Sequence, residues 1–295
     1  MREPADGSRQ TADNTTPAAG SRQTAGGAQP LNSMPGDLAQ ALGELRERRP
    51  DVRCEVRWYP SLPSTMDVVA AAAESGAAAG FTAVADQQTA GRGRRGHLWS
   101  SPPGAGLYFS YLHRPRHGVE LVTLAAGVAV REAIRRSCGL AAQLKWPNDL
   151  LVRSRKLAGL LAEGARIGTP DAAVTIGVGL NLQPAAFPPD VEARATCLAR
   201  EVSEPVDRGV VLAAIIEQLH DTLARLDAGG GSDILQAWRA ASPLSVGTSV
   251  EWNDATSTKR GRTAGLDESG ALLIETANGL ERVIAGELRW TLPDS

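Results

Sequence analysis

The sequence predicts an α+β fold in which helices cover a β-sheet and a small β-barrel follows. In the larger N-terminal part, short apolar strands such as 81–85 and 173–182 alternate with helical segments, of which 119–136 and 206–226 are long. Beyond Pro243, about fifty residues carry only short strands separated by turn residues, a pattern typical of a small barrel. We therefore expect a covered sheet first and an all-β unit second.

Three regions follow from this division. Residues 1–33 are rich in small and polar residues and contain Gly-Ser-Arg-Gln-Thr-Ala twice. They bury too little apolar surface to offset the entropy of ordering. We therefore predict a disordered, low-complexity tail at 1–33, a main domain at 34–242 and a C-terminal domain at 243–295.

The first elements of the main domain show clear periodicity. Residues 37–48 place apolar side chains at helical spacing until Pro50 ends the pattern. Residues 54–59 then alternate as a strand does. Ser64 or Thr65 can cap the next helix, because a hydroxyl oxygen accepts hydrogen bonds from free backbone N–H groups.

The middle of the main domain combines a strand with a long helix. The strand at 107–112 leads into the helix at 119–136, and His113 and His117 flank the junction. A His pair without nearby carboxylates or cysteines is no metal signature. We therefore expect both histidines at the surface.

The next part of the sequence predicts further strands. The runs 144–146 and 150–152 are separated by a Pro-Asn-Asp turn, which places them at the edge of the sheet. Residues 156–163 fit a helix by the spacing of their leucines, or a strand by their brevity and their glycines. The run 173–182 predicts a strand whose glycines indicate close approach of a ligand or another backbone.

The remaining sequence predicts two helices and then the C-terminal strands. The helices lie at 206–226 and 232–241, separated by three glycines. Turn residues such as Asn278-Gly279 divide the strands that follow. Those strands are expected at 249–252, 260–266, 271–275 and 281–285.

The bulk composition argues against several classes of protein. The net charge of −2 is unlike that of a general nucleic-acid-binding protein, and no apolar run approaches the roughly 20 residues of a membrane span. Three cysteines without C-x-x-C spacing argue against a disulfide framework or a zinc site. We therefore expect a cytoplasmic protein that binds neither nucleic acid nor a membrane.

The most distinctive stretch is the Gly-Arg loop, Gly91-Arg92-Gly93-Arg94-Arg95-Gly96, which follows the strand at 81–85. Its glycines let backbone N–H groups approach an anion, and its arginines supply charge and bidentate geometry. The loop lacks the ending of a P-loop and only half matches a dinucleotide fingerprint. On this stretch alone, an anion site and a solvated or nucleic-acid-binding loop are equal alternatives.

Three further motifs favour the anion site. Lys145-Trp146-Pro147-Asn148-Asp149 precedes Arg155-Lys156-Leu157-Ala158-Gly159, and Gly177-Val178-Gly179-Leu180-Asn181 follows. With Ser64-Thr65 and the Gly-Arg loop, this ordered set resembles that of the biotin protein ligases. The resemblance runs from near Ser61 to the C-terminus.

The resemblance carries expectations about architecture. It implies a mixed β-sheet catalytic domain with helices packed on it, followed by an SH3-like β-barrel, and it favours a strand at 156–163. Some members of the family add an N-terminal winged helix-turn-helix, and the ordered residues before Ser61 are too few for one. We therefore expect the monofunctional type without the DNA-binding domain.

The resemblance also implies roles for individual residues. Lys156, Arg92 and Arg94 are expected to be catalytic, by neutralising charge at the reacting carboxylate and the α-phosphate. Asp149 is expected to hold Mg²⁺, which proteins typically bind through one or two carboxylates plus phosphates. The residues expected to bind biotin are Ser64, Thr65, Gln88, Gly91, Arg92, Gly93, Arg94, Lys156 and Gly159, and those expected to bind ATP are Arg94, Trp99, Asn148 and Asn181.

Structural roles compete with some of these assignments. Ser64 and Thr65 also suit helix capping, Asp149 a turn cap, and Trp146 core packing. Met66 stands where the family usually has Asn. An amide contribution at that position must come from the backbone or be absent.

The implied activity is that of an ATP-dependent ligase. It would activate biotin as biotinyl-5′-AMP and transfer it to a lysine of the biotin carboxyl carrier domain of an acyl-CoA carboxylase, with ATP and Mg²⁺. Two anions must meet in the first step, so the work is charge neutralisation and positioning. The alternatives are a lipoate-type protein ligase and a nucleic-acid-binding regulator that uses the Gly-Arg loop. A monomer or weak homodimer is expected.

Overall fold

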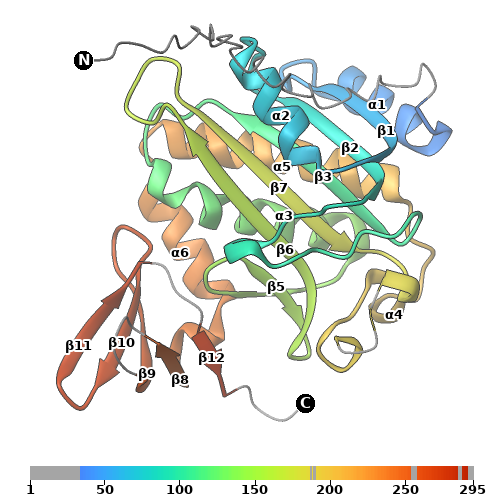
Figure 1. Cartoon of the computed structure of the whole chain (residues 1–295). Helices are drawn as coiled ribbons and strands as arrows, with labels where there is room; N and C mark the ends of the chain where they lie inside the picture. The colour runs from blue at the N-terminus through green and yellow to red at the C-terminus, as the bar shows by residue number, and fades with distance from the viewer. Residues whose placement is uncertain (1–33, 187, 189–190, 254–257, 285–287, 292–295) are drawn as a thin grey trace, which may run out of the picture.

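A seven-stranded mixed sheet forms the centre of the larger part of the chain (Figure 1). The computed structural model describes residues 34–186, 188, 191–253, 258–284 and 288–291. The strand order is β1-β2-β3-β7-β6-β5-β4, and β1 and β2 are the only parallel neighbours among these described strands. The strands are β1 (Glu55–Leu62), β2 (Phe81–Gln88), β3 (Gly106–His113), β4 (Gln143–Lys145), β5 (Asp149–Val152), β6 (Arg155–Ala165) and β7 (Ala173–Asn181).

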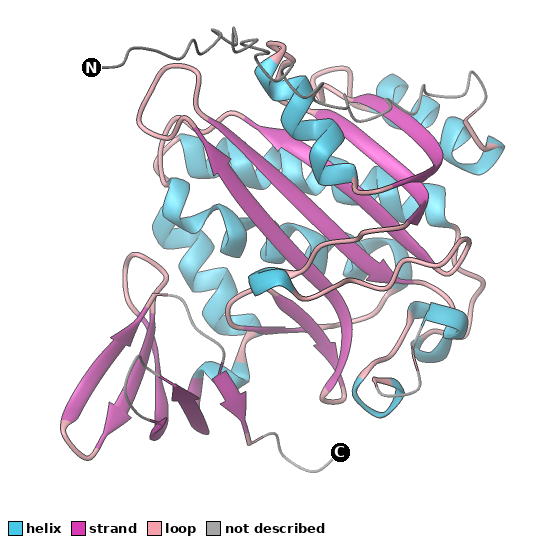
Figure 2. Ribbon diagram, viewed as in Figure 1, coloured by secondary structure: helices cyan, strands magenta, loops and turns pink. Residues whose placement is uncertain are grey.

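Helices cover both faces of this sheet (Figures 1 and 2). On one face α3 and α5 pack against each other and against the sheet, with α1 against α5, while α2 packs on the other face over β2, β3 and β7. The α-helices are α1 (Gly36–Arg48), α2 (Thr65–Glu74), α3 (Val122–Cys138), α4 (Leu198–Glu201), α5 (Arg208–Asp227) and α6 (Gly231–Ala241). Short 3₁₀ turns lie at Arg94–Gly96, Val119–Leu121, Pro184–Ala186, Glu192–Arg194 and Pro243–Ser245.

Strand β7 presents different surfaces to its two sides. Ile176 and Val178 are at most 3 % exposed and belong to the core beneath α3 and α5. Gly177 and Gly179 alternate with them and therefore face the opposite side, where Trp99 lies against Gly179. This glycine-lined side of the sheet carries the cavities described below.

The C-terminal strands form a five-stranded antiparallel sheet in the order β11-β10-β9-β8-β12. No pairing joins β11 to β12 among the described residues, so in that part of the chain the predicted barrel is an open sheet. Trp146 Nε1 donates a hydrogen bond to Gly270 O (3.0 Å), which ties this sheet to the β4–β5 hairpin. The strands are β8 (Val246–Asn253), β9 (Thr258–Leu266), β10 (Leu272–Thr276), β11 (Gly279–Val283) and β12 (Leu288–Trp290).

Most of the predicted elements are confirmed, with shifts of a few residues at their ends. The ambiguous segment 156–163 is a strand, β6, as the resemblance implies. Trp146 is buried, 3 % exposed, as its core-packing role requires. The short helix α4 and the edge strand β12 were not predicted from the sequence. Both have fewer than five residues, which is too short for a periodic pattern to show.

The prediction that His113 lies at the surface is wrong. Strand β3 is buried along its whole length, and His113 at its end is 4 % exposed. Its Nε2 lies 3.7 Å from the Asp227 carboxylate at the end of α5. His117 is exposed, as expected.

Two further predictions concern the N-terminal tail and membrane-spanning helices. The predicted tail at 1–33 lies outside the described residues. Within the described part of the chain, none of the helices combines the length and the apolar character needed to span a membrane.

Candidate active site

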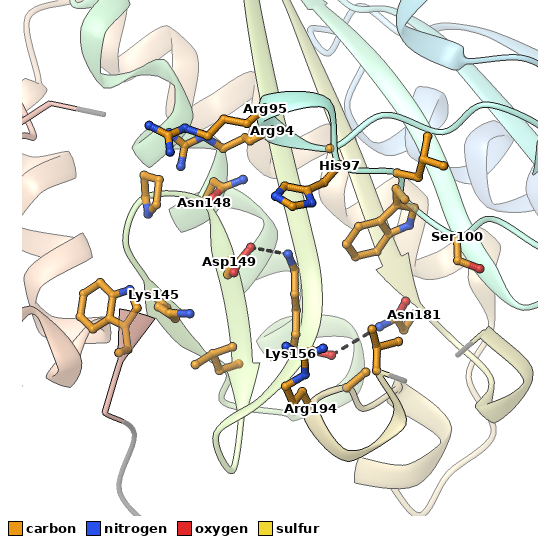
Figure 3. Close-up of a pocket in the computed structure, with 18 of the residues that line it drawn as sticks. Arg94, Arg95, His97, Ser100, Lys145, Asn148, Asp149, Lys156, Asn181 and Arg194 are labelled. Carbon is orange, nitrogen blue, oxygen red and sulfur yellow. Dashed lines mark hydrogen bonds and ion pairs between the residues drawn. The ribbon is translucent and has the colours of Figure 1, made fainter. Parts of the chain in front are cut away.

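Two adjoining cavities open on the glycine-lined side of the sheet. The larger has a volume of about 570 Å³ and the smaller about 30 Å³. Gly93 and Trp99 line both, so the two cavities meet at the Gly-Arg loop. Figure 3 shows the residues around the larger one.

Neutral hydrogen-bonding groups from α2, β2 and β3 border the smaller cavity. Gln88 Oε1 accepts hydrogen bonds from the backbone N–H of Thr65 (2.9 Å) and from its hydroxyl (3.1 Å). Gln88 Nε2 donates to Ser101 Oγ (3.0 Å), and the Thr65 hydroxyl lies 2.8 Å from Ser110 Oγ. These bonds fix the side chains in place, so the groups are held ready for a polar ligand.

The start of α2 forms another wall of the smaller cavity. Ser64 caps the helix, because its Oγ accepts from the Met66 N–H (3.3 Å). Met66 is 3 % exposed, and a Cβ added to Gly177 would lie 2.6 Å from its sulfur. Met66 thus supplies an apolar surface against β7.

The Gly-Arg loop folds back on itself as a short hairpin. The Gly93 N–H donates to His97 O (2.7 Å), and the Trp99 N–H donates to Gly91 O (2.9 Å). At the tip, Arg95 has a φ of 55°, a left-handed conformation that reverses the chain. The Gly93 N–H, predicted to bind an anion, is therefore occupied within the loop.

This hairpin sends the two arginines predicted to act together to different cavities. Arg92 borders the smaller cavity and forms ion pairs with Asp67 (2.6 Å) and Glu163 (3.2 Å). Arg94 borders the larger cavity. Gly91 lines neither cavity, and a Cβ there would lie 2.5 Å from Trp99 O, so its small size permits the hairpin.

Trp99 lies across two glycines that pair between β6 and β7. A Cβ added to Gly179 would lie 2.3 Å from the indole ring, and one added to Gly159 would lie 2.9 Å from it. The indole Nε1 is buried without a hydrogen-bond partner among the described residues. Gly179, one of the two β7 glycines predicted to allow close approach, therefore receives an aromatic ring of the same chain.

Positive charge dominates the larger cavity (Figure 3). Lys156 Nζ lies 2.7 Å from Asp149 Oδ1 and 5.2 Å from the centre of the Trp99 ring. A Cβ on Gly159, which lines the smaller cavity, would lie 3.1 Å from the same Nζ. Lys156 thus reaches the border between the cavities. Among the described lining residues the cations are Arg94, Arg95, Lys145, Lys156 and Arg194, and the one carboxylate is Asp149.

Burial changes the acid–base properties of two of these cations. Desolvation lowers the pKa of Lys145 from its ordinary value, and neighbouring Lys156 lowers it further, while Asp149 acts in the opposite direction. Desolvation and adjacent Arg95 lower the pKa of Arg94, which as a guanidinium still keeps its charge at neutral pH. The cavity therefore holds cations at an energetic cost that a bound anion would offset.

The two asparagines predicted to contact ATP make hydrogen bonds within the protein. Asn148 Nδ2 donates to Leu160 O, across the β5–β6 pair. Asn181 Nδ2 donates to Thr196 O (3.0 Å) and more weakly to Lys156 O (3.4 Å). Both asparagines line the larger cavity, and their amides hold its walls together.

Several lining residues were not identified from the sequence. The C-terminal sheet contributes Leu288 and Trp290 from β12, and the Trp290 ring centre lies 5.7 Å from Lys145 Nζ. The segment that follows β7 contributes Arg194 and Ala195. These residues belong to no recognisable motif, and only the folded chain brings them to the cavity.

Comparisons with known proteins match this geometry. Residues 58–181 match the Biotin/lipoate A/B protein ligase family, and residues 247–288 match the Biotin protein ligase C terminal domain. The chain is 33 % identical to the "Biotin--[acetyl-CoA-carboxylase] ligase" of Paracoccus denitrificans over 213 residues, which cover 70 % of this chain and 88 % of that one. The chain belongs to the biotin protein ligase family.

Other members of the biotin protein ligase family support the same assignment. The chain is 31 % identical to the "Bifunctional ligase/repressor BirA" of Bacillus subtilis, over 78 % of this chain and 72 % of that one. The structure of "Biotin protein ligase from Aquifex aeolicus in complex with biotin and ATP" superposes with a TM-score of 0.69 at 28 % identity, over 80 % of this chain and 98 % of that one. Because one of these ligases is bifunctional by name, the monofunctional type stays a prediction for this chain.

Proposed function

We propose that this ligase activates biotin with ATP as biotinyl-5′-AMP and then transfers biotin to a lysine of a carboxyl carrier domain. The observation that carries the proposal is the junction of the two cavities at Lys156 and Trp99. The neutral hydrogen-bonding groups of the smaller cavity suit the ureido ring of biotin, and the cations of the larger cavity suit a triphosphate. Their border is where the carboxylate of one ligand would meet the α-phosphate of the other.

In the first step a biotin carboxylate oxygen attacks the α-phosphorus of ATP, and pyrophosphate leaves. Lys156 stands at the border and would screen the repulsion between these two anions. Arg94 would neutralise phosphate charge from the loop side of the larger cavity. The smaller cavity would hold the biotin ring through Thr65 and Gln88, which fixes the direction of attack.

A magnesium ion would fit this arrangement only in company with the phosphates. The described residues contain no group of three or more His, Cys, Asp or Glu able to hold a metal, and Asp149 is the one carboxylate among the described lining residues. A single carboxylate suits Mg²⁺, which keeps waters and phosphate oxygens as its other ligands. Asp149 would share its charge between the ion and Lys156, and the ion would reduce the negative charge of the triphosphate.

In the second step the neutral amine of the acceptor lysine attacks the biotinyl carbonyl, and AMP leaves. Lys156 would stabilise the oxyanion that forms on the carbonyl oxygen. The proposed acceptor is the biotin carboxyl carrier domain of an acyl-CoA carboxylase.

We further propose that the ligase works in the cytoplasm as a monomer or weak homodimer. Its cysteines Cys54, Cys138 and Cys197 are all free, which suits a reducing compartment.

The decisive test is biotin-dependent exchange of labelled pyrophosphate into ATP by the purified chain. We expect exchange with biotin and Mg²⁺, and much less with lipoate, which the broader biotin/lipoate family makes the natural alternative acid. Transfer would then be followed by the mass of a biotinylated carrier domain. Equal exchange with lipoate would contradict the choice of acid, and no exchange with either acid would contradict the adenylation mechanism.

A further inference from the structure

A buried carboxylate lies behind the wall of the larger cavity, at the end of α4. The side chain of Glu201 is 0 % exposed. Its Oε1 accepts hydrogen bonds from the Thr196 hydroxyl (2.6 Å) and from Arg155 Nη2 (2.8 Å), and Arg153 Nη1 lies 3.8 Å from its Oε2. Glu201 does not line either cavity. Its contacts therefore need an explanation other than direct ligand binding.

The partners of Glu201 come from two segments that line the larger cavity. Arg155 lies in the β5–β6 hairpin between Ser154 and Lys156, which both line it. Thr196 directly follows Ala195, which lines it from the opposite segment. One buried carboxylate thus holds a point on each wall.

The same two segments also meet through their backbones. The Thr196 N–H donates to Lys156 O (2.9 Å), and Ala195 and Lys156 form an isolated parallel bridge. Asn181 Nδ2 donates to both carbonyls, Thr196 O and Lys156 O. The backbone of Lys156 is therefore positioned by its hydrogen bond with Thr196, and Glu201 holds Thr196 in place from the side away from the cavity.

We propose that Glu201 is a positioning residue that fixes the 191–196 segment against the backbone of Lys156 and so sets the width of the nucleotide cavity. The inference rests on the proposed function, because it assigns ATP to the larger cavity. Glu201 acts through Thr196 and Arg155 and touches no substrate. A carboxylate suits this task, because it can accept from a hydroxyl and a guanidinium at once.

Charge and burial give this contact its rigidity. The Glu201 carboxylate is fully desolvated and lies against two guanidinium groups, and removing its charge leaves Arg155 without its charged partner. Glu201→Gln keeps the size of the side chain and an oxygen for Thr196, but loses the charge. Thr196→Val keeps the size of Thr196 and removes the hydroxyl.

The test compares these two variants and their combination in the pyrophosphate exchange assay. The expected result is a rise of about tenfold in the KM for ATP, with the KM for biotin changed less than about twofold, because the 191–196 segment that Glu201 holds lines the larger cavity and not the smaller one. The KM for ATP of the double variant should be about equal to that of the more affected single variant, since both changes act on the same contact between Thr196 and Glu201. Glu192→Gln is the matched control, because Glu192 lies on the same segment but is exposed, pairs with Arg200 and lines neither cavity.

A second measurement does not depend on activity. Amide hydrogen exchange should show faster exchange of the Thr196 N–H in Glu201→Gln than in the wild type, with the exchange of α3 unchanged. Equal rises in both KM values, or an unchanged KM for ATP in a folded variant, would overturn the inference. If the wild type itself lacked exchange activity, the proposed function would fail, and protection at Thr196 would still decide whether Glu201 positions this wall. Thr196→Val supplies the same readouts if Glu201→Gln does not fold.

Discussion

The two cavities differ in how their polar groups are satisfied. In the smaller one, Gln88, Thr65 and Ser110 bond to one another through neutral groups. In the larger one, five lining cations face the single carboxylate Asp149 among the described lining residues. The polar groups of the smaller cavity are therefore held in place by one another, whereas the larger cavity has an excess of positive charge that an anionic ligand would balance. Shape should dominate recognition in the first, and charge in the second.

Lys156, at the border, should produce the largest effect because it serves both cavities. Lys156→Gln should lower the rate of biotin-dependent pyrophosphate exchange by about 10²–10³-fold, the usual loss when a group that stabilises developing charge is removed. Lys259→Gln is the control, since Lys259 pairs with Glu281 in the C-terminal sheet. If Lys156→Gln kept more than about a tenth of the rate, the border would not be where the two anions meet.

A change at Gly179, which lines the smaller cavity, should affect that cavity more than the larger one. In Gly179→Ala the added Cβ would meet the Trp99 ring at 2.3 Å, so the ring must move. Overpacking costs about 1–3 kcal/mol, so the KM for biotin should rise about tenfold, and more than the KM for ATP. Gly164→Ala is the control, because a Cβ there meets only the Ile167 side chain, at 3.0 Å. Equal effects of the two changes would show that close packing at Trp99 does not govern biotin binding.

The larger cavity should respond to pH through Lys145. Burial places the pKa of Lys145 below its ordinary value of 10.5, so raising the pH toward that value removes its proton and one positive charge. The kcat/KM for ATP should then fall several-fold, by roughly threefold to tenfold, with rising pH, while the KM for biotin stays level. Lys145→Arg should move the fall to higher pH, because a guanidinium keeps its proton. A fall at the same pH in the arginine variant would assign it to another group.

The smallest effect is expected from the wall that the C-terminal sheet provides. Trp290→Ala removes the aromatic face near Lys145, and a cation–π contact of this kind contributes on the order of 1 kcal/mol. The KM for ATP should rise about twofold to fivefold, with little change for biotin. Leu280→Ala, an exposed change in the same sheet, should leave both constants as they are. Should the two variants behave alike, the contribution of the C-terminal sheet to the larger cavity would be refuted.

Local patterns were sufficient to predict most of the fold. The helix at 119–136 was predictable because its apolar positions repeat at the helical period. The strand at 107–112 was predictable as a short, mostly apolar run, and β3 is indeed buried at every position. The segment at 156–163 was not, since leucines at positions 157, 160 and 161 satisfy both periods, and the resemblance to a family was needed. His113 was misplaced, because nothing at the end of a strand indicates whether a helix will cover it.

The sequence predicted which residues form the site, but not which cavity each residue borders or which groups it contacts. The resemblance named Arg92 and Arg94 together, and only the folded loop shows that they border separate cavities. Asn181 was expected to contact ATP, yet its amide bonds to the carbonyls of residues 15 and 25 positions away. Contacts over such separations depend on how the strands are ordered in the sheet, which periodicity does not reveal.

The two lysines that line the larger cavity have a practical consequence for chemical labelling. The whole chain contains three lysines, and the third, Lys259, pairs with Glu281 at 2.8 Å in the C-terminal sheet. Of the lysine side chains that an amine-modifying reagent can label, two of the three therefore lie in the larger cavity. Protection of Lys145 and Lys156, measured against Lys259 as an internal reference, would report occupancy of the cavity from a single mass spectrum.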